Sequence, residues 1–95
     1  MIEGKTINLG GEDYVIAPLT LGQIRSMQKE IESIGRFDAK TLNDGALDIM
    51  IKVIHAGMSR NYPEITTEKI EGLIDLKNIR DVVEAVLGVS GLKKE

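Results

Sequence analysis

The sequence lacks cysteine and tryptophan, and its 95 residues include one histidine, two tyrosines and one phenylalanine. The absence of cysteine excludes disulfides and thiolate metal sites, and it suits a reducing compartment. Three aromatic side chains are too few to form the stacking platforms that bind single-stranded nucleic acids. A single histidine could form a metal site or an acid–base dyad only with carboxylates from elsewhere in the chain.

The sequence also lacks an excess of basic residues and a long apolar run. Twelve Lys and Arg stand against fifteen Asp and Glu, which gives a net charge of −3, and there is no basic arm. Binding to phosphate backbones requires clustered basic residues, so we expect no nucleic-acid partner. There is no run of about eighteen apolar residues that could span a membrane, and the first residues, Met-Ile-Glu-Gly-Lys, lack the apolar h-region expected of a signal peptide. We therefore expect a cytoplasmic protein without a membrane partner.

The most apolar helical segment is Ala46–Met58, ALDIMIKVIHAGM. Its apolar residues recur three and four positions apart and cover most of the helix circumference. The polar residues share one narrow strip: Asp48, Lys52, His55 and Ser59. A helix that is apolar nearly all round is buried on several sides, so we expect this segment to form the centre of the core.

Signals at both ends set the length of the central helix. Thr41 with Asp44 three residues later fits a capping box, and Pro63 cannot continue a helix. The pattern therefore predicts a helix from Leu42 to about Arg60.

Two β-forming runs, residues 5–9 and 13–17, flank a pair of glycines and predict a hairpin. A four-residue loop pairs Leu9 with Tyr14, whereas a two-residue loop pairs Leu9 with Glu12. We prefer the longer loop, although either loop gives the same apolar face. This face must pack on helices, because an isolated hairpin is only marginally stable.

The next helix is predicted from Thr20 to about Ile34. Thr20 with Gln23 forms a capping box, and Gly35 fits the left-handed residue that follows many helices. The apolar stripe of this helix comprises Leu21, Ile24, Met27, Ile31 and Ile34. In the polar connection that follows, we expect Phe37 to cover the core as a lid, and a binding role is the alternative that we weigh against it.

Two shorter helices follow the central one. Thr66 is the expected N-cap of the first, which runs to Ile74. Asn78 is the expected N-cap of the second, which runs to Leu87 and ends at Gly88. The apolar stripe of the last helix comprises Ile79, Val82, Val83, Val86 and Leu87.

Together these elements predict an α+β fold that is mostly helical. An N-terminal β-hairpin packs on about four helices, of which the second is central. The length allows one modest core, so we predict a single compact domain over residues 1–92. Residues 93–95 are expected to form a frayed C-terminal tail.

No pattern in the sequence indicates an active site. His55 lies on the polar strip, where we expect a solvent-exposed bystander. Asp44 and Asp48 could act as paired acids, but Asp48 with Lys52 is an equally good surface ion pair, which we prefer. The glycines of residues 88–91 lack the spacing of a nucleophile elbow. We therefore expect no enzyme activity, no cofactor and no metal.

Two short helices joined by a tight turn are also the layout of a helix-turn-helix DNA-binding protein. A recognition helix needs Arg, Lys, Asn or Gln on its exposed face. In this chain Arg80 is accompanied there by Asp81 and Glu84. A small DNA-binding regulator is therefore kept as an alternative function.

Several short motifs suggest a family. They are Tyr14-Val15-Ile16, Pro18-Leu19-Thr20-Leu21-Gly22, Arg60-Asn61-Tyr62-Pro63-Glu64-Ile65-Thr66, Ile70-Glu71, Leu73-Ile74-Asp75-Leu76, Asn78 and Ala85-Val86-Leu87-Gly88-Val89-Ser90-Gly91-Leu92. With these motifs, roughly residues 14 to 92 resemble the tail assembly chaperone family of long-tailed bacteriophages and prophages. Other small phage head–tail or tail-completion proteins are a second alternative.

The resemblance implies a non-catalytic protein that binds the long helical tape-measure protein, with tail-tube subunits as a second partner. Such a chaperone acts in the cytoplasm of the bacterial host and is not expected in the mature virion. In that family a longer form often arises by ribosomal frameshifting, and this chain ends just after Gly91-Leu92, where the short form would.

A partner surface is expected among apolar side chains that lie outside the core stripes, because a tape-measure helix presents apolar stripes of its own. The candidates are Tyr62, Pro63, Leu76, Val89 and Leu92. The alternative is that these side chains close one end of the core, with Val89 packed on Val83. Self-association is also compatible with the sequence.

Overall fold

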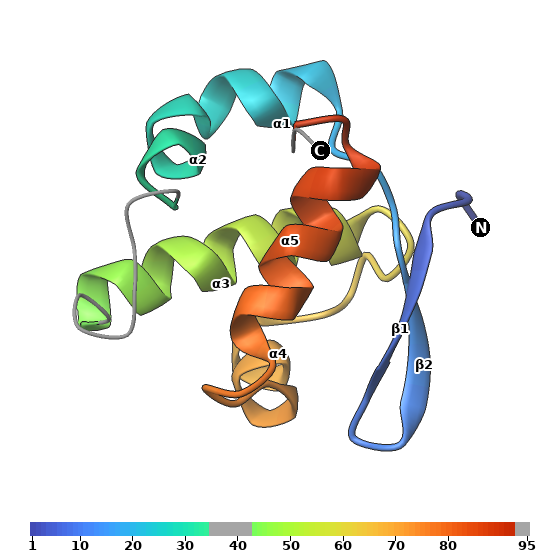
Figure 1. Cartoon of the computed structure of the whole chain (residues 1–95). Helices are drawn as coiled ribbons and strands as arrows, with labels where there is room; N and C mark the ends of the chain where they lie inside the picture. Colours follow the sequence, from blue (N-terminus) through green and yellow to red (C-terminus); the bar gives the residue numbers. More distant parts are fainter. Residues whose placement is uncertain (35–42, 93–95) are drawn as a thin grey trace.

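The computed structural model describes residues 1–34 and 43–92 (Figure 1). Its elements are β1 (Lys5–Leu9), β2 (Glu12–Ile16), α1 (Leu21–Ser26), α2 (Gln28–Ile34), α3 (Asp44–Ser59), α4 (Thr67–Leu73) and α5 (Ile79–Val89). The two strands form an antiparallel hairpin. The predicted α+β, mostly helical fold class is confirmed.

Helix α3 lies at the centre of the molecule and contacts α2, α4, α5 and β2. In Figure 1, α1 and α2 lie on one side of α3, α4 lies on the other, and α5 crosses it. Val53, Ile54 and Met58 of α3 have no exposed surface. The buried side chains of the hairpin and the helices form one hydrophobic cluster. The predicted central helix is therefore confirmed.

Gly57 lies where α3 packs closely against α5 and β2. A Cβ atom on this residue would lie 3.0 Å from both methyl carbons of Val86 in α5 and 3.3 Å from Cγ2 of Ile16 in β2. Its carbonyl also accepts a hydrogen bond from the Ala17 N–H at 3.1 Å. The glycine therefore lets helix and hairpin pack closely on α3.

The hairpin has the shorter of the two loops considered from the sequence. Leu9 pairs with Glu12, so the preferred four-residue loop is wrong and the two-residue loop is present. The reason lies in Gly10 and Gly11, whose φ angles are 62° and 87°. Two successive positive φ angles are typical of a type I′ turn, which matches the twist of paired strands.

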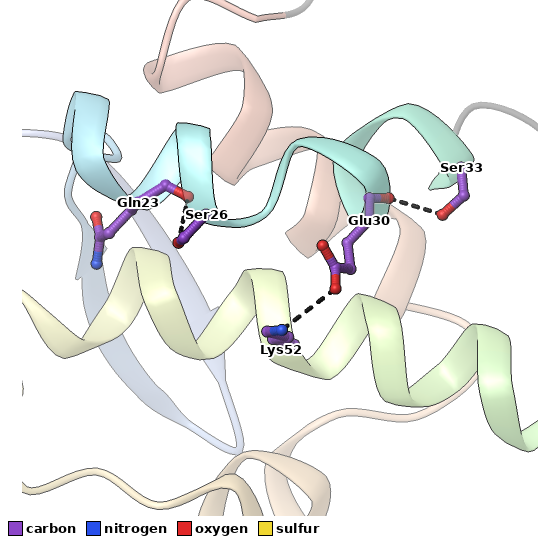
Figure 2. A network of polar contacts seen from close by, with 5 residues as sticks. All are labelled: Gln23, Ser26, Glu30, Ser33 and Lys52. Atoms are coloured by element: carbon purple, nitrogen blue, oxygen red, sulfur yellow. Dashed lines mark hydrogen bonds and ion pairs between the residues drawn. The ribbon is translucent and has the colours of Figure 1, made fainter.

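The first predicted helix is divided into α1 and α2. The capping box is confirmed, since Thr20 and Gln23 exchange side-chain to backbone hydrogen bonds of 3.0 and 2.9 Å. The helix is interrupted at Met27, whose ψ angle is 21°. Figure 2 shows Ser26, whose hydroxyl donates to the Gln23 carbonyl at 3.1 Å. A hydroxyl that competes for a helix carbonyl in this way weakens regular helical bonding.

The interruption also changes the predicted apolar stripe of this region. Met27 and Ile34 are buried, and Ile24 and Ile31 are half-buried, as predicted. Leu21 is an exception, because 79% of its surface is exposed. It is the first residue of the short helix α1 and lies beyond the edge of the core.

Helix α3 begins at a different cap from the predicted one. The side-chain oxygen of Asn43 accepts a hydrogen bond from the Ala46 N–H at 2.9 Å, which makes Asn43 the N-cap. Asparagine is among the best N-cap residues, so its position next to the helix start is favourable. The predicted cap Thr41, the predicted stop Gly35 and the predicted lid Phe37 lie outside the described residues.

Of the N-caps predicted for the last two helices, the cap of α4 is confirmed and the cap of α5 is not. Thr66 caps α4 as predicted, because its side chain accepts from the Lys69 N–H at 3.0 Å. Asn78 makes no side-chain cap bond to α5. Instead, Asp75 and Asn78 exchange side-chain to backbone bonds of 2.8 and 3.0 Å, which places the capping box one turn earlier.

Helix α5 continues past Gly88, so the predicted end at this residue is wrong. The left-handed residue is Gly91, with a φ angle of 78°. The N–H of Leu92 bonds the carbonyl of Leu87 at 2.9 Å, and the N–H of Gly91 bonds the carbonyl of Gly88 at 3.1 Å. This pair of bonds is a Schellman motif, which satisfies the last carbonyls of the helix.

Candidate functional site

The described residues contain no buried cluster of titratable side chains. Residues 1–34 and 43–92 include no buried polar or charged residue. The same residues include no group of three or more His, Cys, Asp or Glu that could hold a metal ion. None of the helices in the described part of the chain could cross a membrane.

His55 is half-buried, so the prediction of a solvent-exposed bystander is wrong. Its Nε2 atom lies 3.0 Å from the carbonyl oxygen of Ile65. The contact joins α3 to the loop that precedes α4. His55 therefore has a structural contact that its place on the polar strip did not indicate.

Lys52 does not form the expected pair with Asp48. Its Nζ atom lies 3.2 Å from Oε2 of Glu30, which joins α3 to α2 (Figure 2). A backbone hydrogen bond and the bond from Lys52 hold the pKa of Glu30 below its usual value. The Lys52–Glu30 pair is exposed and adds little to stability.

Asn61 and Tyr62, which follow α3, form hydrogen bonds with the N-terminal segment and the hairpin. The Asn61 side-chain oxygen accepts from the Ile2 N–H at 2.7 Å, and its nitrogen donates to the carbonyls of Ile2 and Val15 at 2.9 and 3.1 Å. The Val15 N–H donates to the Tyr62 hydroxyl at 2.8 Å. Because Val15 is on an outer edge of the hairpin, these two side chains satisfy backbone groups that no strand covers.

The five predicted partner residues do not form one surface. Tyr62 and Pro63 line a hollow beside Tyr14, and Val89 lines a hollow of about 920 Å³ between β1 and α5. Leu92 lines a hollow of about 310 Å³ among α2, α3 and α5. Leu76 lies before the start of α5 and Leu92 lies after its end. The eleven residues of α5 separate them by about 16 Å.

Leu76 borders a hollow that combines an apolar lining with a cluster of carboxylates. This groove has a volume of about 280 Å³ and lies between the N-terminal half of α3, the end of α4 and the start of α5. Its apolar lining comprises Leu47, Ile51, Ile74, Leu76 and Ile79. Leu76 exposes 69% of its surface, whereas Ile51 and Ile79 are buried in the floor. We call it the Leu76 groove.

The rim of the Leu76 groove is acidic. Its polar lining consists of Asp44, Asp48, Glu71 and Asp75, and no lysine or arginine lines it among the described residues. Asp44 lies in the first turn of α3, where the helix dipole favours a carboxylate. Asp75 accepts bonds from the backbone N–H groups of Lys77 and Asn78.

The other two carboxylates of the rim belong to Asp48 and Glu71, and neither accepts a hydrogen bond from a described residue. Within residues 1–34 and 43–92, the structure shows no hydrogen bond or ion pair at the side chains of Asp48 and Glu71. Both residues are exposed. Their charges are therefore free to meet a basic partner.

The geometry of α5 disfavours the helix-turn-helix alternative. Its buried residues are Ile79, Val82, Val83, Ala85 and Val86. It contacts α3 and both strands, so much of its surface lies within the core. A recognition helix must present one face to the major groove, and the exposed face of α5 carries Asp81 and Glu84 beside Arg80.

Comparison of the chain with protein-family models, with curated proteins and with solved structures gives no match. The motifs of the sequence and the geometry of the surface are therefore the basis for a proposed function.

Proposed function

We propose that the protein is a non-catalytic tail assembly chaperone of a long-tailed phage or prophage. It binds the tape-measure protein in the cytoplasm of the bacterial host, with tail-tube subunits as a second partner. It leaves before the tail is finished, so the mature virion does not contain it. The observation that carries the proposal is the Leu76 groove, an open hollow with an apolar lining between α3, the end of α4 and the start of α5.

The groove suits a helical partner on physical grounds. An amphipathic helix lays its apolar stripe into a hydrophobic groove through residues spaced three and four apart. Leu76 offers exposed apolar surface for such a stripe, and the half-buried Leu47 and Ile74 extend it. A long helical protein with uncovered apolar stripes aggregates, and a chaperone prevents this by covering them.

Co-expression with the tape-measure protein tests the proposal. We expect the tape-measure protein to accumulate in the soluble fraction and to co-purify with the tagged chain. The same tape-measure protein expressed alone serves as the control and should aggregate. Equal aggregation with and without the chain, together with no co-purification, would overturn the proposal.

Purified phage particles separate a chaperone from a head–tail or tail-completion protein. A structural protein of the virion remains in the particle, whereas a chaperone is present only in the infected cell. Mass spectrometry should therefore detect the chain in lysates and not in particles. Stoichiometric amounts in particles would favour the structural alternative.

A further inference from the structure

We propose that the Leu76 groove binds an amphipathic helix whose apolar stripe is flanked by lysine or arginine. The inference rests on the proposed function and deepens it, because it names the docking site and the chemistry of the tape-measure segment that binds there. Two independent properties of the groove lead to it: its apolar lining and its acidic rim.

The apolar lining selects a helix with an apolar stripe. Leu47 and Ile51 are one turn apart on α3, and Leu76 faces the same groove from the turn before α5. Leu76 is 69% exposed, so its apolar surface is available to a partner. Burying it against a second apolar side chain removes that surface from water, which favours binding.

The acidic rim selects basic flanks. Asp44 and Asp48 are one turn apart on α3, and Glu71 and Asp75 come from the end of α4 and the turn that follows. Opposite charges across an interface steer encounter and fix orientation, whereas like charges repel. Because Asp48 and Glu71 make no ion pair with another described residue, a basic partner displaces no existing pair there.

The same rim disfavours a second copy of the chain as the occupant. A symmetric dimer through this groove would bring the same patch of both copies together. The four carboxylates of one copy would then face the four of the other. Like charges placed opposite one another across an interface oppose such a dimer.

Binding of designed peptides tests the chemistry of the groove. The probe is a labelled helical peptide of about 18 residues, or five turns, with a leucine stripe flanked by lysines. Two further peptides serve as controls: the same stripe flanked by glutamates, and a scrambled sequence of the lysine peptide. Fluorescence anisotropy should show binding of the lysine peptide only.

Paired variants locate the binding. Leu76→Ser should weaken binding of the lysine peptide by about tenfold, because a central apolar anchor is removed. Leu21→Ser is the matched control, since Leu21 is a 79% exposed leucine on the distant helix α1. It should leave the affinity unchanged. Thermal melts should show that both variants remain folded.

A charge reversal tests the rim. The double variant Asp48→Lys, Glu71→Lys should lose its preference for the lysine peptide over the glutamate peptide. Glu32→Lys, on α2 and on the opposite side of α3 from α4, changes charge away from the groove and should keep the preference. The inference is overturned if Leu21→Ser weakens binding as much as Leu76→Ser. It is also overturned if the glutamate or scrambled peptide binds equally well.

Two further measurements separate this inference from the proposed function and from self-association. If the tape-measure protein co-purifies equally with wild type, Leu76→Ser and the charge-reversed chain, the groove is not its site, and the chaperone function stands. If the lysine peptide binds in the groove but no tape-measure protein binds, the chaperone function is overturned. A dimer in analytical ultracentrifugation that dissociates on Leu76→Ser would assign the groove to a second copy and overturn the inference.

Discussion

At the scale of single residues, Asn61 and Tyr62 explain part of the motif that suggested a family. Asn61 bonds Ile2 and Val15, which are 59 and 46 residues away in the chain. The sequence indicated only that the helix stops before Pro63. It could not indicate the bonds, because the hairpin is brought to this loop by tertiary packing.

The Tyr62 hydroxyl should contribute to stability. Tyr62→Phe removes the acceptor of the Val15 N–H and should lower the free energy of unfolding by about 1 kcal/mol. Tyr14→Phe is the matched control, because the two rings lie edge to face at 5.4 Å and the structure shows no hydrogen bond at the Tyr14 hydroxyl among the described residues. Urea unfolding of both variants measures the difference. Equal losses would mean that the hydroxyl bond adds nothing.

The orientation of α3 can be tested with two neighbouring residues. Ile54 has no exposed surface, so Ile54→Ala should cost about 2–5 kcal/mol. His55→Ala should cost about 1 kcal/mol, because it removes the contact with the Ile65 carbonyl. Denaturant unfolding provides both values. A larger loss at His55 than at Ile54 would show that the helix is rotated.

Glu30 gives a pH-dependent prediction. Its pKa is lowered by a backbone hydrogen bond and by Lys52, so its stabilising effect is present above the usual pKa of 4.5 and is lost as the pH falls through the lowered value. Lys52→Met should raise the pKa of Glu30 toward its usual value in an NMR titration. Lys29→Met, which removes a weaker charge effect, should raise it less. No change with Lys52→Met would contradict the ion pair.

At the scale of elements, periodicity predicted the helices better than their ends. Most residues of the apolar stripes of α3 and α5 are buried as their three- and four-residue spacing indicates, and Leu47, Ile49 and Leu87 are half-buried. The end of α5 was misplaced because Gly88 and Gly91 both suit a helix stop, and only the backbone bonds select Gly91. The apolar stripe of residues 21–34 did not indicate the interruption at Met27, because Met27 is buried as a residue of a continuous helix would be.

The crossing of α3 and α5 gives a prediction about glycine. Gly57→Ala should destabilise the protein by about 1–3 kcal/mol, because the added methyl group presses on Val86. Gly72→Ala is the control, since a Cβ there meets no atom within 4 Å and alanine favours the helix. Thermal and denaturant unfolding should show a lower stability for Gly57→Ala and a higher stability for Gly72→Ala than for the wild type. A stabilising Gly57→Ala would contradict the close packing of the two helices.

At the scale of the whole molecule, the sequence predicted one residue of the Leu76 groove, Leu76 itself, as a partner-binding residue. Leu76 was selected because it lies outside the core stripes. The acidic rim was missed because it combines residues 44 and 48 with residues 71 and 75, which only the packing of α3 against α4 brings together. The other predicted partner residues line three different hollows: Val89 lies beside β1, Leu92 beside α2, and Tyr62 with Pro63 beside Tyr14.

Hydrogen exchange of the chain with and without its tape-measure partner tests the central claim most directly, because it maps the covered surface without a mutation. We predict slower exchange on binding in residues 44–51 and 71–79, which form the Leu76 groove, and unchanged exchange in the hairpin and α1. Slower exchange confined to the hairpin, or no change anywhere in the chain, would contradict the claim.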